Sequence, residues 1–491
     1  MHFTQKALGI HSLEYIQKTA RTCAHYLMAQ HSRESPFLFL CGMGNNGSTG
    51  LALAHILLEN NYSVKVWYVQ HREAPKPENK TLLNKIIGIN ASYVDYIDRD
   101  FSLPELREQV IIVDAIWGIG NHQIAEDWLD DFFSKINQSP HHKIAIDIPS
   151  GLGADTISNK SVKAIIAAHE TICLQWYKRT MLHPETAKFC GQIRVLEIGL
   201  NPDCIPIEKC PYQTVESTLL EPFIKKKTDF SHKNQHGHVF IIGGSKGKTG
   251  AAILATHAAL RSGVGLVTSV VPQESYLPLQ FNAPEAMCHT SGKETIDHID
   301  PYEQATAFAV GVGMGTHIET VAAFSKFIKL CQAPCVIDAD ALNILAMQPD
   351  LLSYLPNNSV LTPHVGECHR LFGQKDNSIE QVEDLRKQAM LYKVCIVLKG
   401  HRSIIVSPKG TCYYNLNGNP GMAKGGSGDV LTGLLSGLLA QGYPSEYAAQ
   451  LAVYLHGLSG DLAAKLLGQE AMNAMDLIGR LSYAWQKLAK T

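Results

Sequence analysis

The sequence predicts an α/β protein made of two domains, each built on a parallel β-sheet. Short apolar runs of strand length alternate with helix-length segments through most of the 491 residues. Glycine-rich turns follow several of these runs, as they do at the carboxyl edge of parallel sheets. The alternation breaks at residues 201–236, which hold prolines and three consecutive lysines. We therefore predict a first domain at 1–212, a linker at 213–230 and a second domain at 231–491.

The first domain is expected to open with a helix at 12–30 and to form a Rossmann-like parallel sheet. Its strands are expected at 37–41, 63–69, 110–113 and 144–148, with closure near 195–198. An apolar helical run at 49–58 separates the first two strands. Strands joined through helices pair in parallel, because a parallel pair needs a long crossover connection.

The second domain repeats this alternation. Its strands are expected at 238–242, 266–270, 307–312, 335–338, 394–398 and 403–406, with helices between them. A helix is expected at 430–440 after a glycine-rich turn, and another at 447–465. On the latter, His456 and Asp461 are more typical of packing and capping than of catalysis.

Composition excludes several classes of function. The net charge is −2, so no basic field is available to bind nucleic acid. No run of 18 apolar residues occurs, so no membrane span is expected. The twelve cysteines are scattered without a CxxC pair, so neither a zinc site nor a disulfide framework is predicted. Reduced thiols and the lack of a signal-peptide pattern favour a cytoplasmic protein, and we also expect a homo-oligomer.

A dinucleotide-type loop follows the first expected strand. Gly42, Gly44 and Gly47 satisfy G-x-G-x-x-G between a strand and a helix, the context in which this pattern binds pyrophosphate. The second strand, however, ends at 69–71 in Val-Gln-His, with no acidic residue to hold a ribose diol. An ordinary NAD dehydrogenase is therefore disfavoured.

Polar residues follow other strands of the same domain. Asp114 follows one expected strand and Asp147 another, while Asn45 and Asn46 lie in the glycine-rich loop. The carboxyl ends of parallel strands meet at one edge of the sheet, where such folds bind ligands. For each aspartate taken alone, a helix cap or a turn is the alternative.

Three motifs, GxGNNG at 42–47, DAxxGxG at 114–120 and DIPSGL at 147–152, together resemble the NAD(P)HX epimerase domain. The resemblance implies a potassium ion near Asn46, Asp114 and Ser150, and it implies that Asp147 transfers a proton. It also implies that the substrate, NADHX or NADPHX, contacts Asn45, Asn46, Gly47, Ser48, Thr49, Gly118, Ile119, Gly120 and Asp147.

The sequence departs from this family pattern within the first loop. Where the family reads GNNGGDG, Ser48 and Thr49 replace the second glycine of the pair and the aspartate. A hydroxyl group can hydrogen-bond a ribose, but it is not a base near neutral pH. Two alternatives therefore remain for the first domain: epimerisation of (6R)- and (6S)-NAD(P)HX, or ligand binding without catalysis.

The most informative motif lies at 419–433 and contains Gly425-Gly426-Ser427-Gly428-Asp429 directly before an apolar helix. Glycines at a helix start direct backbone N–H groups to one point, where the helix dipole favours an anion such as phosphate. Asp429 cannot hold that anion, but it can take a proton from a hydroxyl that attacks a phosphoryl group. We therefore predict phosphoryl transfer to a small-molecule alcohol, rather than a flexible loop before a core helix.

Other strand-end motifs leave alternatives open. The stretch at 243–249 fails the Walker A spacing by one residue. Asp338 and Asp340 follow a strand, and they either bind magnesium through water or cap a helix. His364 follows a proline in a tight turn, where histidine is more often structural. A Lys-Gly turn at 399–400 can place backbone along a nucleotide phosphate or ribose.

Together, GGSxG, GVGxG, DADAL, LTPHxGE, LKG and NPGMAKGGSGDVLTG resemble the nucleotide-dependent NAD(P)H-hydrate dehydratases, which have a ribokinase-like fold. The match covers about residues 230–490, and resemblance to the two-domain repair enzymes spans almost the whole chain. It implies that adenine nucleotide is bound by Lys399, Gly400, His401, Arg402, Ser403, Gly426, Ser427 and Gly428. It implies that the hydrated cofactor contacts Ala252, Gly313, His364 and Asp429.

The implied reaction phosphorylates the hydroxyl of a hydrated nicotinamide ring, because phosphate leaves more readily than hydroxide and its departure restores the double bond. Asp429 would activate the hydroxyl, Mg2+ would offset phosphate charge, and ADP (or ATP) would be the donor. The alternative is a ribokinase-like kinase of a vitamin or small alcohol with a non-catalytic first domain. The motifs at 399–400 and 363–364 favour the dehydratase.

Overall fold

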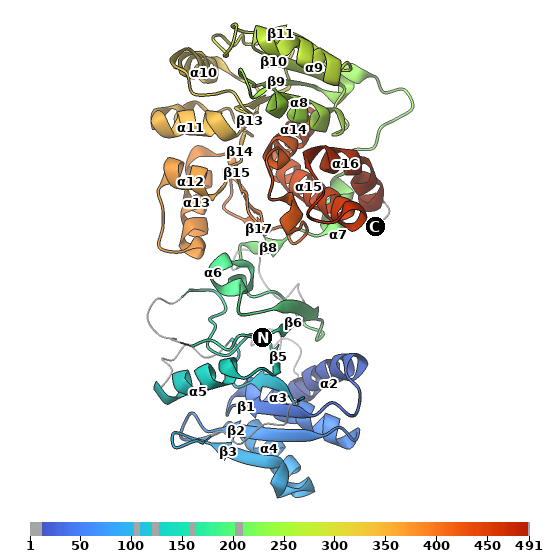
Figure 1. The fold of residues 1–491 in the computed structure, drawn as a ribbon, viewed down its shortest axis with the longest axis vertical. Helices are drawn as coiled ribbons and strands as arrows, with labels where there is room; N and C mark the ends of the chain where they lie inside the picture. Colours follow the sequence, from blue (N-terminus) through green and yellow to red (C-terminus); the bar gives the residue numbers. More distant parts are fainter. Residues whose placement is uncertain (1–11, 103–108, 120–126, 158–163, 202–209, 490–491) are drawn as a thin grey trace. The chain divides into compact units, whose positions relative to one another are not determined.

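The computed structural model describes residues 12–102, 109–119, 127–157, 164–201 and 210–489. The chain divides into two compact units, with the main boundary between residues 209 and 210 (Figure 1). Each unit holds one sheet with helices on both faces, so the predicted α/β class is confirmed.

The first unit contains a seven-stranded, fully parallel sheet in the order β3-β2-β1-β4-β5-β6-β7. Its strands are β1 (Phe37–Cys41), β2 (Val64–Val69), β3 (Val94–Ile97), β4 (Ile111–Ala115), β5 (His142–Ile146), β6 (Glu170–Leu174) and β7 (Gln192–Leu196). Its helices are α2 (Ser12–Gln30), α3 (Asn45–Glu59), α4 (Pro77–Ile89), α5 (Asp127–Gln138) and the short α6 (Pro184–Ala187). The strand order reverses between β1 and β4, the place where such sheets bind ligands.

Successive side chains of β1 point to opposite faces of this sheet. Phe37 and Phe39 pack into the core formed with α2, α3 and α4. Leu38 and Leu40 point the other way, into the core that α5 covers with Phe132 and other apolar residues. Because both faces are covered, β1 is buried along its whole length and reads as a continuous apolar run.

The second unit contains a ten-stranded sheet in the order β11-β10-β9-β12-β13-β14-β15-β16-β17-β8. The pairs β15–β16 and β16–β17 are antiparallel, and the other pairs are parallel. Its strands are β8 (Tyr212–Thr214), β9 (His238–Ile242), β10 (Leu266–Val271), β11 (Met287–Thr290), β12 (Ala307–Val310), β13 (Cys335–Ile337), β14 (Val360–Leu361), β15 (Cys395–Leu398), β16 (Ile404–Val406) and β17 (Cys412–Tyr414).

Helices cover this sheet on two sides (Figure 1). One side carries α10 (Ile318–Leu330), α11 (Ala339–Met347), α12 (Val365–Phe372) and α13 (Ser378–Tyr392). The other carries α8 (Thr249–Leu260), α14 (Ser427–Ala440), α15 (Ser445–Leu467) and α16 (Ala474–Leu488). Two shorter helices are α7 (Ser217–Leu220) and α9 (Tyr276–Asn282). Apolar residues of α14 are buried almost throughout, which places its amino end firmly at the sheet edge.

The expected strands are present in both units, with shifts of one or two residues at several ends. Strands β3, β6, β8, β11, β14 and β17 fall outside the expected ranges. β3 and β11 are edge strands with exposed polar positions, so they lack the apolar run that marks a buried strand. Helix α14 begins at Ser427 rather than at 430, and α3 at Asn45 rather than at 49.

The predicted linker at 213–230 needs correction. The end of β8 and helix α7 lie within it, and β8 pairs in parallel with β17 as the last strand of the second sheet. Val215 and Leu220 are buried in the core of that unit. A three-residue edge strand has too few positions to show a periodic pattern. The prediction of a linker therefore rested on composition alone.

Among the described residues, no helix is both long and apolar enough to cross a membrane. The described cysteines are free thiols.

Helices α8 and α14 approach each other most closely at Gly433. A Cβ atom at this position would lie 1.9 Å from the backbone oxygen of Ala255. We expect Gly433→Ala to force the two helices apart and to lower the free energy of unfolding by roughly 1–3 kcal/mol. Thermal unfolding followed by circular dichroism measures the change. The control is Gly479→Ala on α16, where no atom lies within 4 Å of the added methyl and helix propensity predicts a gain of roughly 0.5–1 kcal/mol. Equal effects in both variants would contradict the steric explanation.

Candidate functional site

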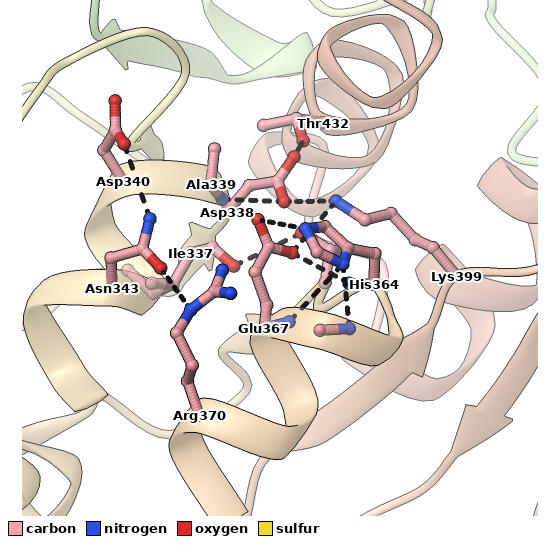
Figure 2. A network of polar contacts seen from close by, with 12 residues as sticks. Ile337, Asp338, Ala339, Asp340, Asn343, His364, Glu367, Arg370, Lys399 and Thr432 are labelled. Carbon is pink, nitrogen blue, oxygen red and sulfur yellow. Dashed lines mark hydrogen bonds and ion pairs between the residues drawn. The ribbon is translucent and has the colours of Figure 1, made fainter. Parts of the chain in front are cut away.

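The carboxyl edge of the second sheet holds a buried polar network around Asp338 (Figure 2). Asp338 follows β13 directly, caps α11 and accepts a hydrogen bond from the Ala339 N–H at 2.8 Å. Lys399, which follows β15, places its Nζ 2.5 Å from Asp338 Oδ1. Thr432 of α14 donates its hydroxyl to Asp338 Oδ2 at 2.6 Å. The network therefore links two strand ends to the first turns of α14.

The first turn of α14 is open toward this network. Its N-cap residue is Gly426, whose φ of +91° is strained for other residues, and no side chain caps the helix. A Cβ at Gly428 would lie 3.6 Å from Lys399 Nζ. Backbone N–H groups at this helix end therefore lie beside an ammonium group, a combination suited to a phosphate.

Asp429 lies in the same turn and differs from its acidic neighbours in its electrostatics. The pKa of Asp429 is raised to about 7, chiefly by burial and also by the negative charges of Asp338 and Asp340, while Lys399 acts in the opposite direction. A carboxyl group with a pKa near neutrality can accept a proton and release it again, which is what a general base requires. The structure thus brings together the predicted base, the predicted anion site and Lys399.

Lys424 of the predicted motif and Asp461 of α15 both make structural contacts with loops. The Lys424 Nζ donates to backbone oxygens of Glu470 and Met472, at 2.5 and 2.6 Å, so it holds the loop before α14. Asp461 accepts from the Gly418 N–H at 2.9 Å and from Asn419 Nδ2 at 3.0 Å, and so fixes the turn at 418–419. This agrees with the structural interpretation of Asp461.

His456 packs rather than reacts. Burial lowers the pKa of His456 to about 4, so its imidazole is neutral at ordinary pH.

His364, the N-cap of α12, and Asp340, in the first turn of α11, lie at the same edge of the sheet. His364 caps α12 by accepting from the Gly366 N–H at 3.0 Å, while its side chain stays half exposed. Glu367 completes this capping box and lies 3.7 Å from Lys399 Nζ. Asp340 accepts from the Gly315 N–H at 2.7 Å and lies 3.5 Å from Lys248 Nζ. Asp338 is thus a cap and an ion-pair partner at once, and His364 has a structural role in addition to any contact with substrate.

The residues predicted to bind the nucleotide after Lys399 are not part of the network around Asp338. Gly400 is exposed, Arg402 donates to the Leu416 oxygen, and Ser403 donates to the Gly400 oxygen at 3.2 Å. Burial lowers the pKa of His401, and Arg402 acts in the same direction. Their contact with nucleotide stays a prediction.

Gly313 accepts from Ser245 Oγ at 2.9 Å, beside a cavity of about 490 Å³ that Ser245, Lys248 and Gly315 line. Ala252 is fully buried in α8, next to Val271 and Leu279. The methyl group of Ala252 is therefore not exposed to the site, and its contact with substrate also stays a prediction.

The first unit has a cavity of about 360 Å³ at the carboxyl edge of its sheet. Six of the predicted residues line it: Asn45, Asn46, Thr49, Gly118, Ile119 and Asp147. Gly47 does not, because it is packed so closely that a Cβ would lie 1.7 Å from the Gly42 oxygen. Ser48 is fully buried, and Gly120 lies outside the described residues.

Asp114 lies fully buried beneath this cavity. Its carboxylate accepts from the Ser150 N–H and hydroxyl, at 2.7 and 2.6 Å, and from the Ile116 N–H at 3.2 Å. Burial raises the pKa of Asp114 to about 6, although these hydrogen bonds act in the opposite direction. Asn46 donates its amide to the Trp117 and Ile146 oxygens at 2.8 and 3.0 Å, and its Oδ1 accepts no hydrogen bond from a described residue.

Asp147 is paired with a lysine that the sequence interpretation missed. Asp147 has a left-handed φ of +71°, and its Oδ1 forms a buried ion pair with Lys178. Burial by itself lowers the pKa of Lys178, but the Asp147 carboxylate and the Cys173 thiol raise it overall. Lys178 lies four residues after the end of β6. A basic residue just beyond a parallel strand is the sequence feature that would have suggested it as a site residue.

Ser48 and Thr49 use their hydroxyl groups within α3. Ser48 Oγ donates to the Gly44 oxygen at 2.9 Å, and Thr49 Oγ1 donates to the Asn45 oxygen at 3.2 Å. In each case the hydroxyl proton is donated to the backbone oxygen four residues earlier, so both hydroxyl groups have a hydrogen-bond acceptor within the protein. Thr49 still borders the cavity, but with a group that cannot serve as a base.

The chain matches two family models. Residues 239–482 match the model described as NAD(P)H-hydrate dehydratase, and residues 12–180 match the one described as YjeF-related protein N-terminus. A curated relative, the bifunctional NAD(P)H-hydrate repair enzyme Nnr of Moorella thermoacetica, is 34% identical, covering 92% of this chain and 87% of the relative. The enzyme of the same name from Escherichia coli is 31% identical, covering 96% and 90%.

A solved structure resembles the second unit. A ribokinase-like superfamily protein from Enterococcus faecalis V583 aligns with a TM-score of 0.51 and 30% identity, covering 57% of this chain and 98% of that one. The predicted ribokinase-like fold is thereby confirmed.

The hydroxyl of Thr432 is expected to stabilise the protein through Asp338. Thr432→Val keeps the shape of the side chain but leaves the buried Asp338 Oδ2 without this donor, so we expect a loss of roughly 1–3 kcal/mol in the free energy of unfolding. Urea denaturation measures it. Thr432→Ser keeps the hydroxyl and serves as the matched variant. If Thr432→Val proves as stable as Thr432→Ser, this hydrogen bond does not support the network.

Proposed function

This chain belongs to the family of bifunctional NAD(P)H-hydrate repair enzymes, and from that premise we propose how its two units restore NADH and NADPH from their hydrated forms. The second unit is a nucleotide-dependent NAD(P)H-hydrate dehydratase of ribokinase-like fold. The first unit is the epimerase-type domain of the family. The observation that carries the proposal for the second site is the pKa of about 7 at Asp429, beside the open end of α14.

Asp429 acts as the general base in the proposed dehydration. The hydroxyl oxygen of the hydrated nicotinamide ring attacks the terminal phosphorus of the nucleotide, and Asp429 takes the hydroxyl proton. The bond from that phosphorus to the nucleotide breaks. The phosphate ester then leaves the ring as inorganic phosphate, and a ring proton is lost as the double bond forms. Phosphorylation is needed because hydroxide is a poor leaving group.

Backbone N–H groups of Gly426, Ser427 and Gly428 are proposed to bind the transferring phosphate. Support comes from the open helix end and from Lys399, whose Nζ lies close to Gly428. Lys399 would partly offset the phosphate charge while Asp338 and Thr432 hold it in place. The loop at 399–403 is proposed to bind the adenine nucleotide, ADP or ATP.

Magnesium is proposed to enter with the phosphates of the nucleotide. Within the described ranges, no group of three or more His, Cys, Asp or Glu side chains is placed to hold a metal. Mg2+ commonly binds through one or two carboxylates together with substrate phosphates. Asp429 and Asp338 are the carboxylates beside the proposed phosphate site, and the ion would offset phosphate charge there.

In the first unit, Asp147 is proposed to transfer a proton to or from the substrate, with Lys178 as its partner. Their buried ion pair, on the wall of the cavity, supports this role. Potassium is proposed to bind at Asn46, Asp114 and Ser150, where it would neutralise a buried charge. The residues fit, because no cationic side chain in the described part of the chain pairs with Asp114, and Asn46 Oδ1 is free.

Family membership disfavours a vitamin or small-alcohol kinase, which would share Asp429 and the helix end but keep its phosphorylated product. The reactants are accordingly NADHX or NADPHX and an adenine nucleotide. A cytoplasmic location and a homo-oligomeric state stay predictions.

The dehydratase proposal is tested by following recovery of NADH absorbance from an epimeric mixture of hydrated NADH with Mg2+, K+ and ADP or ATP. The base must be ionised to accept a proton, so the rate is expected to rise with pH and to level off above about 7. Asp429→Asn should lower kcat by roughly 10²–10⁴-fold. No recovery with either nucleotide would reject the dehydratase and favour the kinase.

The same assay distinguishes the two alternatives for the first unit. Complete recovery, faster than spontaneous epimerisation in a control, would mean an active epimerase; recovery that stops at the fraction of one epimer would mean a silent one. The double variant Ser48→Gly/Thr49→Asp restores the family carboxylate and is expected to raise the epimerisation rate by roughly 10²-fold or more. Ser48→Gly/Thr49→Asn is the uncharged control. Equal rates in both variants would show that the missing carboxylate is not the defect.

A further inference from the structure

Two basic side chains line the cavity of the first unit just beyond β2. Arg72 follows the end of this strand, and Lys76 immediately precedes α4. Lys76 Nζ donates to Asn45 Oδ1 at 2.9 Å, within the glycine-rich loop. Neither cation pairs with a carboxylate among the residues that the structure describes. The mouth of the cavity therefore carries positive charge that no carboxylate of the described residues neutralises.

Arg72 lies against the turn that opens α3. A Cβ at Gly44 would lie 2.7 Å from Arg72 Nη2. Gly44 is the N-cap of α3, and no side chain caps this helix. The N–H groups of its first turn are thus directed toward the same region as the guanidinium group. A multiply charged anion is the ligand that this arrangement favours.

Trp117 supplies a separate indication that the cavity receives a ligand. Its side chain is 7% exposed and lines the cavity, and its indole N–H is buried without a hydrogen-bond partner within the described ranges. Buried indole N–H groups usually find an acceptor. The missing acceptor is therefore expected to arrive with the bound molecule.

The place of Arg72 just after the second strand favours one particular phosphate group of the cofactor as its ligand. In sheets of this type, the side chain that follows the second strand contacts the 2′ position of the adenosine ribose: an acidic residue binds the free diol, and an arginine accommodates a 2′-phosphate. No acidic residue ends β2 here, and Arg72 and Lys76 follow it instead. We propose that the cavity of the first unit binds the 2′-phosphate of the cofactor through Arg72 and Lys76 and so prefers NADPHX to NADHX. This inference rests on the proposed function and specifies the cofactor form.

The test uses the full chain with NADP+ and NAD+, two stable dinucleotides that differ only in the 2′-phosphate. Hydrogen–deuterium exchange of the peptide spanning 42–59 reports binding at the first unit separately from binding at the second. NADP+ should protect this peptide at about tenfold lower concentration than NAD+. Arg72→Gln should weaken NADP+ binding by about tenfold and leave NAD+ binding unchanged. Lys80→Gln removes the same charge from α4 outside the cavity and should alter neither.

Three results would overturn the inference: equal affinity of the unmodified chain for the two dinucleotides, equal weakening of both by Arg72→Gln, and no protection by either. Equal weakening would mean that the cations bind the shared pyrophosphate. NADH recovery by the same preparation tests the proposed function independently, because the exchange measurement needs no turnover. A chain that repairs NADH but shows no NADP+ preference would reject this inference alone.

Discussion

The buried ion pair between Asp338 and Lys399 is the interaction on which the second site depends. It joins the loop after β13 to the loop after β15, and the Thr432 hydroxyl extends it to α14. Ion pairs of this kind contribute little net stability, because removing both charges from water costs about as much as their attraction returns. The value of this pair is geometric, since it holds three separate segments together at the proposed phosphate site. The same pair determines the charges that Asp429 experiences.

Asp429, in the first turn of α14, and Asp147, just after β5, are carboxylates in different environments. Asp429 lies near Asp338 and is partly desolvated, so its pKa is raised to about 7. Asp147 has an ammonium partner in Lys178. A base that must release its proton within each cycle benefits from the first arrangement. A carboxylate that must stay in one position within a buried cavity benefits from the second.

Much of the fold could be predicted because each element carries its own local signal. The buried parallel strands are apolar runs, and glycine-rich turns mark the ends of β1, β9 and β12. Prediction failed for β3, β11 and β17, where edge positions or short length remove the apolar run, and no range was predicted for β6, β8 or β14. Of the site residues, Asp429 and Gly426 were predicted from a contiguous motif. Lys178 was missed, because only the folded sheet brings β5 and β6 side by side.

The sequence by itself determined the fold class, the order of the motifs and the chemical groups available, because these depend on residues close together along the chain. It also determined the loss of the family carboxylate at Thr49. Only the tertiary structure decided that Asp338 is both a helix cap and the partner of Lys399, that Ala252 is buried, and that Arg72 lies against Gly44. These facts arise from contacts between segments that are distant in the sequence. The packing of helices on a sheet creates such contacts, and no local sequence pattern predicts them.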